Sequence, residues 1–194
     1  KELLNFCTLD LSSFYFDIRK DVLYCDSLKS EKRKNCIIVL NIILNCLLKW
    51  FAPVLVFTTD EIYSLVGKKD KSIHESIFPV IPKKWENKIL NTKWKSLYNI
   101  KQEANIAIEE KRASKEIGSS LEAQIKITIN KKDYELLNGL DLAEYFITSK
   151  GEKFKGEDSE KTKIEVQKAK GSKRPRCWKI LETVCVRCES ANKE

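Results

Sequence analysis

Three cysteines near the C-terminus have the residue type and spacing that bind a metal ion. Cys185 and Cys188 are separated by two residues, which lets two thiolates hold one tetrahedral zinc ion. A closed structural site needs a second pair, but upstream only Cys177 is present, with Arg174 where the other cysteine would be expected. Three thiolates bind zinc if water, Glu189 or a residue from elsewhere completes the shell. The alternative is a set of reduced thiols without metal.

The segment around these cysteines is strongly basic and contains one tryptophan. Cations neutralise phosphates and an indole stacks on an unpaired base, so this composition suits nucleic acid. The predicted phosphate contacts are Lys168, Lys170, Lys173, Arg174, Arg176, Lys179 and Arg187, with Trp178 as the stacking residue. Arg19 and Lys20, on the polar face of the first predicted helix, are further candidates. The alternative is a solvated basic tail whose tryptophan packs on a neighbouring sheet.

The composition of the chain is that of a reduced, cytosolic protein. It has 194 residues, a net charge of +8 and seven cysteines in a background rich in lysine and glutamate, which is unlike a secreted disulfide framework. Cys7, Cys25, Cys36 and Cys46 lie among apolar residues, where a free cysteine behaves as a small hydrophobe. The chain begins at Lys1 and contains no methionine, so we expect it to be a piece of a longer polypeptide.

Two consecutive helices, over residues 11–25 and 35–51, are predicted to form the centre of the fold. The first carries an apolar stripe at helical spacing, and Asp10 precedes it as the expected N-cap. The second is apolar nearly all round, which predicts a position in the middle of a bundle, and Pro53 ends it. The alternative is a membrane span, but the uninterrupted apolar run is shorter than the ~20 residues that a span needs.

The remaining elements change from helices to strands along the chain. Helices are predicted over residues 59–66 (ended by Gly67), 92–117 and 131–137 (capped by Asn130), strands over 124–130, 145–148 and 162–168, a polar connector over 68–85 and a charged loop over 151–161. The predicted fold class is mainly α. We expect a helical bundle over residues 1–117, a small α+β unit over 118–170 and a basic, zinc-knuckle-like tail over 171–194.

Several blocks of the chain resemble the anticodon-binding region of bacterial isoleucyl-tRNA synthetases. They are Asp10-Leu-Ser-Ser-Phe-Tyr-Phe-Asp-Ile-Arg-Lys-Asp-Val-Leu-Tyr-Cys-Asp26, Trp50-Phe-Ala-Pro-Val-Leu55, Phe57-Thr-Thr-Asp-Glu-Ile62 and Ile117-Gly-Ser-Ser-Leu-Glu-Ala123. Arg176-Cys-Trp-Lys179 followed by Cys185-Val-Arg-Cys188 is similar to the C-terminal zinc knuckle of that family. The resemblance covers nearly the whole chain, and the block from Asp10 to Asp26 is its most specific part.

The resemblance implies a tRNA-binding region of a class I enzyme that joins isoleucine to its tRNA with ATP. The catalytic and editing domains, with the ATP and Mg²⁺ they use, would then lie upstream in the same polypeptide. The region itself would bind the anticodon stem-loop of tRNA(Ile), hold zinc through the three C-terminal cysteines and catalyse nothing. It also implies a cytoplasmic monomer without membrane contact.

Two other functions compete with this interpretation. The chain could be the same region of a sister synthetase, most plausibly the valyl enzyme, because a helical bundle alone does not separate these relatives. It could also be a non-enzymatic helical interaction module whose basic tail keeps it soluble. An independent enzyme is not expected, because no nucleophile–base pair, carboxylate pair or phosphate-binding glycine loop stands out.

Overall fold

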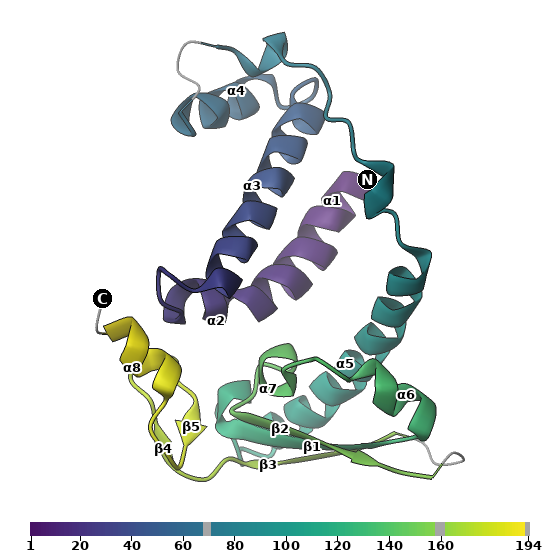
Figure 1. Ribbon diagram of the computed structural model, residues 1–194, viewed down its shortest axis with the longest axis vertical. Helices are drawn as coiled ribbons and strands as arrows, with labels where there is room; N and C mark the ends of the chain where they lie inside the picture. The colour runs from purple at the N-terminus through teal and green to yellow at the C-terminus, as the bar shows by residue number, and fades with distance from the viewer. Residues whose placement is uncertain (68–70, 158–161, 193–194) are drawn as a thin grey trace. The chain divides into compact units, whose positions relative to one another are not determined.

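The computed structural model describes residues 1–67, 71–157 and 162–192 (Figure 1). The chain divides into two compact units, one made of Lys1–Leu28 with Lys88–Glu194 and the other of Lys29–Asn87. The predicted fold class is confirmed, because the chain is mainly helical, with a small mixed sheet and a cysteine cluster near the C-terminus. The domain boundaries expected near residues 117 and 170 stay predictions.

In the unit Lys29–Asn87, the described residues form two α-helices and two short 3₁₀ turns. They are α3 (Glu31–Phe51), α4 (Val56–Leu65), η2 (Ile73–Glu75) and η3 (Lys83–Trp85). The side chain of Ser30 accepts a hydrogen bond from the amide of Arg33 and so caps α3. Leu48, Ala52, Tyr63 and Ile73 form the small core of this unit.

Helix α3 is less buried than its apolar sequence predicts. Only Cys36, Cys46 and Leu48 are buried in it, and α4 and η2 are the elements of its own unit that pack against it. The expectation of a helix contacted on several sides is therefore not met by the described residues. Among these residues α3 is also the one helix long and apolar enough to cross a membrane, judged by length and composition alone.

Helix α4 begins three residues before the predicted start. No side chain caps its start; the hydroxyl of Thr59 donates to the carbonyl of Leu55, inside the first turn. Gly67 follows the helix with a φ of 94°, which is the left-handed conformation expected at its end. Within the polar connector, residues 68–70 lie outside the described part of the chain.

The first helix of the other unit runs without a break from Glu2 to Cys25. It comprises α1 (Glu2–Asn5), the π-helical segment η1 (Phe6–Phe16) and α2 (Asp17–Cys25). The predicted N-cap at Asp10 is wrong, because the turns before the apolar stripe are helical too. Leu11, Ile18, Val22 and Cys25 are buried along the stripe, as its spacing predicts.

Helix α5 (Lys88–Ala113) packs against strand β3 (Lys163–Lys168) of the sheet. It starts and ends four residues before the predicted limits, because Lys115, with a φ of 61°, turns the chain before Gly118. Its inner face also carries a lysine: the Lys101 ammonium is buried and donates to the carbonyl of Tyr145 at 2.7 Å. Burial lowers the pKa of Lys101 to about 8.

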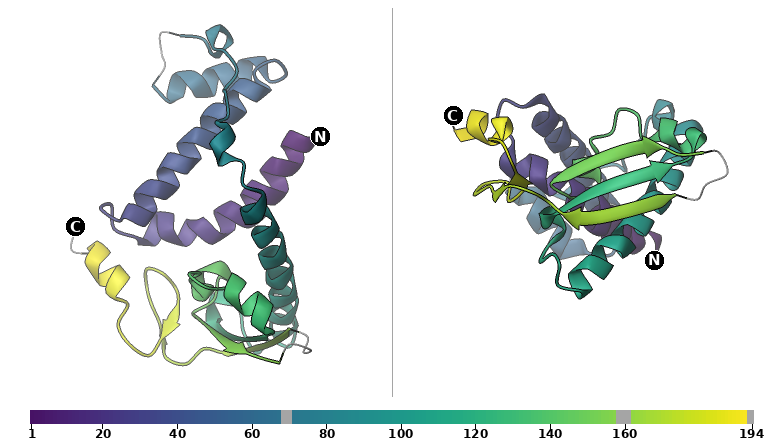
Figure 2. Two further views of the ribbon diagram at one scale, coloured as in Figure 1. Left: turned by 45° about the vertical axis from the view of Figure 1, so that its right-hand side comes forward. Right: turned by 90° about the horizontal axis from the view of Figure 1, so that it is seen from below.

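The sheet of this unit has three strands in the order β2–β1–β3 (Figure 2). The central strand β1 (Ala123–Ile129) pairs in parallel with β2 (Lys150–Lys155) and antiparallel with β3 (Lys163–Lys168). Alternate residues of β1, among them Ile125 and Ile127, are buried and join the core that α5 also lines. The predicted strands over 124–130 and 162–168 are confirmed.

Two predicted elements of the small α+β unit are wrong. Residues 145–148 are not a strand: α7 (Leu142–Tyr145), capped by Asp141, occupies their start and a turn follows. The charged segment predicted as a loop over residues 151–161 contains most of strand β2, while 158–161 lie outside the described residues. The short helix α6 (Lys131–Leu136) is confirmed, with the Asn130 side chain accepting from the Asp133 amide as its cap.

Candidate metal centre and basic surface

The C-terminal knuckle consists of a small hairpin and a final helix. The hairpin pairs β4 (Ser172–Lys173) with β5 (Ile180–Leu181), and α8 (Val186–Asn192) follows. Cys177 lies in the turn of the hairpin, whereas Cys185 and Cys188 lie at the start of the helix. The hairpin turn and the helix start thus converge on one point from two directions.

The three predicted metal ligands are brought together by this arrangement. The Sγ atoms of Cys177, Cys185 and Cys188 all lie within 4.8 Å of one another. Cys177 and Cys188 are buried and Cys185 is half-buried, so little water competes for the cluster. Three thiols that face one another at this distance could hold a metal ion.

The thiols of the cluster differ in acidity. Burial raises the pKa of Cys185, but hydrogen bonds from Cys188 and Cys177 outweigh it, so its pKa is lowered. Burial and the hydrogen bonds with Cys185 and Cys177 raise the pKa of Cys188. A lowered pKa favours the thiolate form of Cys185, which is the form that binds a metal cation.

Arg174 stands where a fourth cysteine was expected and holds the hairpin together instead. Its Nη2 donates to the carbonyl of Leu181 at 3.2 Å and to that of Thr183 at 2.6 Å. These two acceptors lie in the second strand and just after it. The guanidinium thus connects the residue that follows β4 to β5 and to the segment just after it. The turn that contains Cys177 lies between them in sequence.

Arg176 joins the knuckle to the end of helix α2. Its Nε donates to the carbonyl of Cys25 and its Nη2 to the carbonyl of Tyr24, both at 3.3 Å. Carbonyl groups in the last turn of a helix have no amide of that helix to accept from. The guanidinium of Arg176 donates to them in place of water. This interaction spans about 150 residues of sequence.

Arg187 makes a second connection to the same helix end. Its Nη1 lies 2.7 Å from Oδ2 of Asp21 and 3.2 Å from Oδ1 of Asp26, and its Nη2 donates to the other oxygen of Asp21 at 3.1 Å. Burial raises the pKa of Asp21, but the Arg187 guanidinium overcomes this and holds that pKa below its usual value. The knuckle is therefore docked on α2 by both arginines.

Arg19 and Lys20 also have carboxylate partners in the protein. Arg19 forms an ion pair of 2.7 Å with Glu144, the buried acid of α7, and Lys20 pairs with Asp17 one turn earlier in its own helix. As candidate RNA contacts, these two residues and the three knuckle arginines Arg174, Arg176 and Arg187 stay predictions. In this structure each of them already binds a protein group.

The remaining predicted contacts lie on the outside of the knuckle and of β3. Lys168, Lys170 and Lys173 are exposed and Lys179 is half-buried. Trp178 is 60% exposed, and its backbone is in the left-handed conformation with a φ of 60°. The ammonium of Lys173 lies 5.7 Å from the centre of that indole, a cation–π distance. Here the structure brings the tryptophan and a lysine together.

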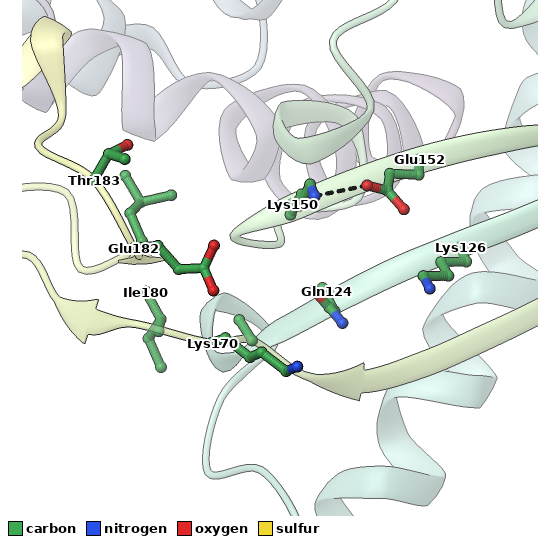
Figure 3. Close-up of a pocket in the computed structure, with 10 residues that line it drawn as sticks. Gln124, Lys126, Lys150, Glu152, Lys170, Ile180, Glu182 and Thr183 are labelled. Carbon is green, nitrogen blue, oxygen red and sulfur yellow. Dashed lines mark ion pairs between the residues drawn. The ribbon is translucent and has the colours of Figure 1, made fainter.

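A hollow of about 470 Å³ lies between the outer face of the sheet and the knuckle (Figure 3). Lys170 lines it together with Lys126 and Lys150, two cations that the sequence patterns did not single out. The alternation of β1 was a signal for Lys126, because it places that residue on the solvent face. Lys150 pairs with Glu152 at 2.6 Å along its own strand, and Glu182 also lines the hollow, so the lining has both charges.

Comparison with known proteins defines the class. Residues 1–127 match the family described as the anticodon-binding domain of tRNA ligase. Since the match covers more than half of its residues, the chain belongs to this family.

The relatives of the chain carry a more particular name. It is 52% identical over 187 residues to isoleucine–tRNA ligase of Pelagibacter ubique, which covers 96% of this chain and 21% of that protein. It is 37% identical over 194 residues to the enzyme of the same name from Agrobacterium fabrum (95% and 20%). With the enzyme of that name from Caldanaerobacter subterraneus it shares 36% identity over 211 residues (96% and 22%).

The resemblance to isoleucyl-tRNA synthetases is confirmed by these matches. The chain spans only about a fifth of the length of the relatives, and it aligns with a C-terminal region of them.

Proposed function

We propose that this chain is the tRNA-binding region of an isoleucine–tRNA ligase. The observation that carries the proposal is the match of residues 1–127 to the anticodon-binding family, together with relatives named isoleucine–tRNA ligase. In the proposal the chain binds the anticodon stem-loop of tRNA(Ile). Activation of isoleucine with ATP and Mg²⁺, and its transfer to the tRNA, belong to catalytic and editing domains of the same polypeptide. The chain acts as a cytoplasmic monomer without membrane contact.

The exposed lysines and Trp178 are the proposed contacts to RNA. Lys168, Lys170 and Lys173 are exposed, whereas Lys179 is half-buried and acts electrostatically on Asp21; none of the four forms an ion pair with another described residue, and we propose that their ammonium groups bind phosphates. Phosphate contacts position an RNA without reading its sequence, and an exposed indole adds stacking on an unpaired base of the loop. In the proposal the arginines of the knuckle act mainly by keeping this surface in place.

Zinc is the metal proposed for the three-cysteine cluster. Bonds of about 2.3 Å in tetrahedral geometry place zinc-bound sulphur atoms about 3.8 Å apart, and a cluster whose Sγ atoms lie within 4.8 Å can contract to that spacing. Thiolates are soft ligands, so a site made of them binds zinc in preference to harder cations. When bound, zinc would supply a structural crosslink between the hairpin and α8, with no part in the chemistry of the enzyme.

Binding of purified tRNA transcripts tests the proposal. The chain is titrated into labelled tRNA(Ile) and tRNA(Val) at several salt concentrations. We expect preferential binding of tRNA(Ile), with an affinity that falls as salt rises, because bound phosphates release counterions. Preference for tRNA(Val) would assign the chain to the sister enzyme. Absence of binding to either tRNA would contradict the proposal and favour a protein-interaction module.

A further inference from the structure

The metal cluster of the knuckle has three thiols, and its own segment offers no fourth cysteine. Arg174 occupies the place of that residue and is engaged with two carbonyl oxygens. Structural zinc sites are closed, with four protein ligands. A structural centre here therefore needs a ligand from another part of the chain.

Cys25, the last residue of α2, lies in the same buried cluster. It is 6% exposed and packs with Cys177 and Cys188, with Cys185 against them. Four of the seven cysteines of the chain, from two segments about 150 residues apart, thus meet in one place. A small apolar residue would fill this position as well as a cysteine does, so packing alone does not call for a thiol there.

The backbone around Cys25 is tied to both arms of the cluster. The Cys25 thiol donates to the carbonyl of Arg176 at 3.6 Å, while Arg176 donates back to the Cys25 carbonyl. Arg176 directly precedes Cys177. On the other side Arg187, which lies between the two cysteines of α8, binds Asp21 and Asp26. The residues that flank each ligand are therefore fixed against the helix end that carries Cys25.

Other candidates for the fourth position are less suitable. The carboxylates of Asp21 and Asp26 are engaged by Arg187. Glu189, on α8, is exposed. His74, the only histidine, belongs to the other compact unit, where it lies against the carbonyl of Val56. Among the described residues Cys25 is the buried soft ligand that remains beside the three.

We propose that Cys25 is the fourth thiolate ligand of the metal centre, an inference that rests on the proposed zinc site. Ligation requires the Cys25 thiol to leave the Arg176 carbonyl and the Asp21 carboxylate and to turn toward the other three sulphur atoms, with loss of its proton to solvent. The metal then bridges helix α2 and the knuckle. Arg174 is compatible with this arrangement, because the cysteine it replaces is supplied from α2.

Cobalt(II) substitution tests the proposal on the whole chain. Co²⁺ is added to the reduced, metal-free protein, and the thiolate-to-cobalt charge-transfer absorption is measured, whose intensity follows the number of Co–S bonds. We expect Cys25→Ser to lose about a quarter of the absorption per bound cobalt, because one of four thiolates is removed. Cys36→Ser, which alters a buried cysteine outside the cluster, is the matched control and should leave the spectrum unchanged.

Each outcome is decisive. Equal absorption in the wild type and Cys25→Ser would overturn the proposal while leaving a three-cysteine centre in place. Absence of cobalt absorption in both would overturn the metal centre and with it the role of Cys25. X-ray absorption of the zinc-loaded wild type needs no variant: four sulphur ligands support the proposal, whereas three sulphurs and one oxygen or nitrogen contradict it.

Discussion

The arginines of the knuckle bind protein groups more closely than their position in a basic tail indicates. Arg187 illustrates this, because its side chain is 30% exposed while its partner Asp26 is 8% exposed. A guanidinium can bind two carboxylates through its separate N–H groups, which an ammonium cannot do with the same geometry. Charge at this position therefore serves the docking of the knuckle on α2.

Replacing Arg187 should destabilise the chain. In Arg187→Met, the partly buried carboxylates of Asp21 and Asp26 lose the guanidinium that pairs with them, so we expect the free energy of unfolding to fall by about 2 kcal/mol. Urea denaturation followed by circular dichroism measures the change. Arg187→Lys keeps the charge but loses the two-pronged guanidinium geometry. Its free energy of unfolding should lie between those of the wild type and Arg187→Met. A loss below about 0.5 kcal/mol in Arg187→Met would contradict the docking role.

The same ion pair predicts a loss of stability in acid. The pKa of Asp21 is lower in the folded protein than its ordinary value, so the unfolded chain binds the proton more readily. The stabilisation is complete above the ordinary pKa of the carboxyl, near 4, and is lost as the pH falls through the lower, folded value. Acid titration of the wild type and of Asp21→Asn measures this. We expect the wild type to lose more stability than the variant between pH 5 and the acid limit, and parallel curves would refute the assignment.

At the scale of the elements, the position of the sheet on α7 depends on a single glycine. A Cβ added to Gly151, in β2, would lie 2.6 Å from Cβ of Leu142 and 3.0 Å from the backbone nitrogen of Ala143. Backbone atoms cannot move aside as the end of a flexible side chain can. The absence of a side chain at this residue is therefore a condition for the close approach of strand and helix.

We expect Gly151→Ala to lower the free energy of unfolding by about 2–3 kcal/mol, as overpacking does. Thermal and urea denaturation measure the loss. Gly139→Ala is the control: Gly139 has a φ of 78° and nothing within 4 Å of the added Cβ, so only the conformational cost of about 1 kcal/mol is expected. Equal losses in the two variants would show that contact with α7 does not limit this position.

Local patterns predicted the elements whose information is local. The alternation of β1 reflects one buried face, and the cap of α6 depends on a hydrogen bond between residues three apart, Asn130 and Asp133. Likewise Pro53 and Gly67 act at single positions. Such signals can be read without knowing the rest of the fold.

The elements that were predicted wrongly depend on distant neighbours. Strand β2 has the sequence Lys-Gly-Glu-Lys-Phe-Lys, whose charged residues do not show the alternation typical of a strand. It forms because its backbone pairs with that of β1. Charged residues are common on such edge strands, where they oppose aggregation. Tyr145 and Phe146 are buried at the end of α7 and in the turn that follows it, where Ile147 has a φ of 57°.

The sequence pointed to the cysteines of the candidate site, but not to the contacts that hold their segment on α2. The spacing of Cys185 and Cys188 pointed to a metal cluster, and the structure brings Cys177 to them. The partners of Arg187 could not be identified from the sequence, because Asp21 lies 166 residues away along the chain. The residue type alone does not show whether an arginine is solvent-exposed or paired with a buried carboxylate.

At the scale of the whole molecule, the lysines of the C-terminal region should determine the salt dependence of RNA binding. In a variant with alanine at Lys168, Lys170, Lys173 and Lys179, the log–log slope of the binding constant against salt should become shallower by about 2.8, because each single-strand phosphate that is no longer neutralised reduces it by about 0.7. Filter binding of tRNA(Ile) at several salt concentrations measures the slope. Trp178→Ala should instead weaken binding with little change in slope.

A control variant with the same reduction in charge separates local from general effects. Alanine at Lys71, Lys83, Lys84 and Lys88 removes four exposed lysines from another part of the chain. We expect this variant to retain most of the wild-type slope. An equal reduction in both variants would mean that net charge, rather than the surface around Trp178, attracts the RNA.

The docking of the knuckle on α2 also has a consequence for the order of events during synthesis. A ribosome releases the acidic end of α2 long before it releases Arg176 and Arg187, its partners more than 150 residues later. Until then Asp21, Asp26 and the carbonyl groups of Tyr24 and Cys25 lack their contacts with these two arginines. Contacts of such long sequence separation form late and slowly. The end of α2 therefore gains these contacts only after Arg176 and Arg187 have been synthesised. A nascent chain that stops before them lacks the contacts that join α2 to the knuckle.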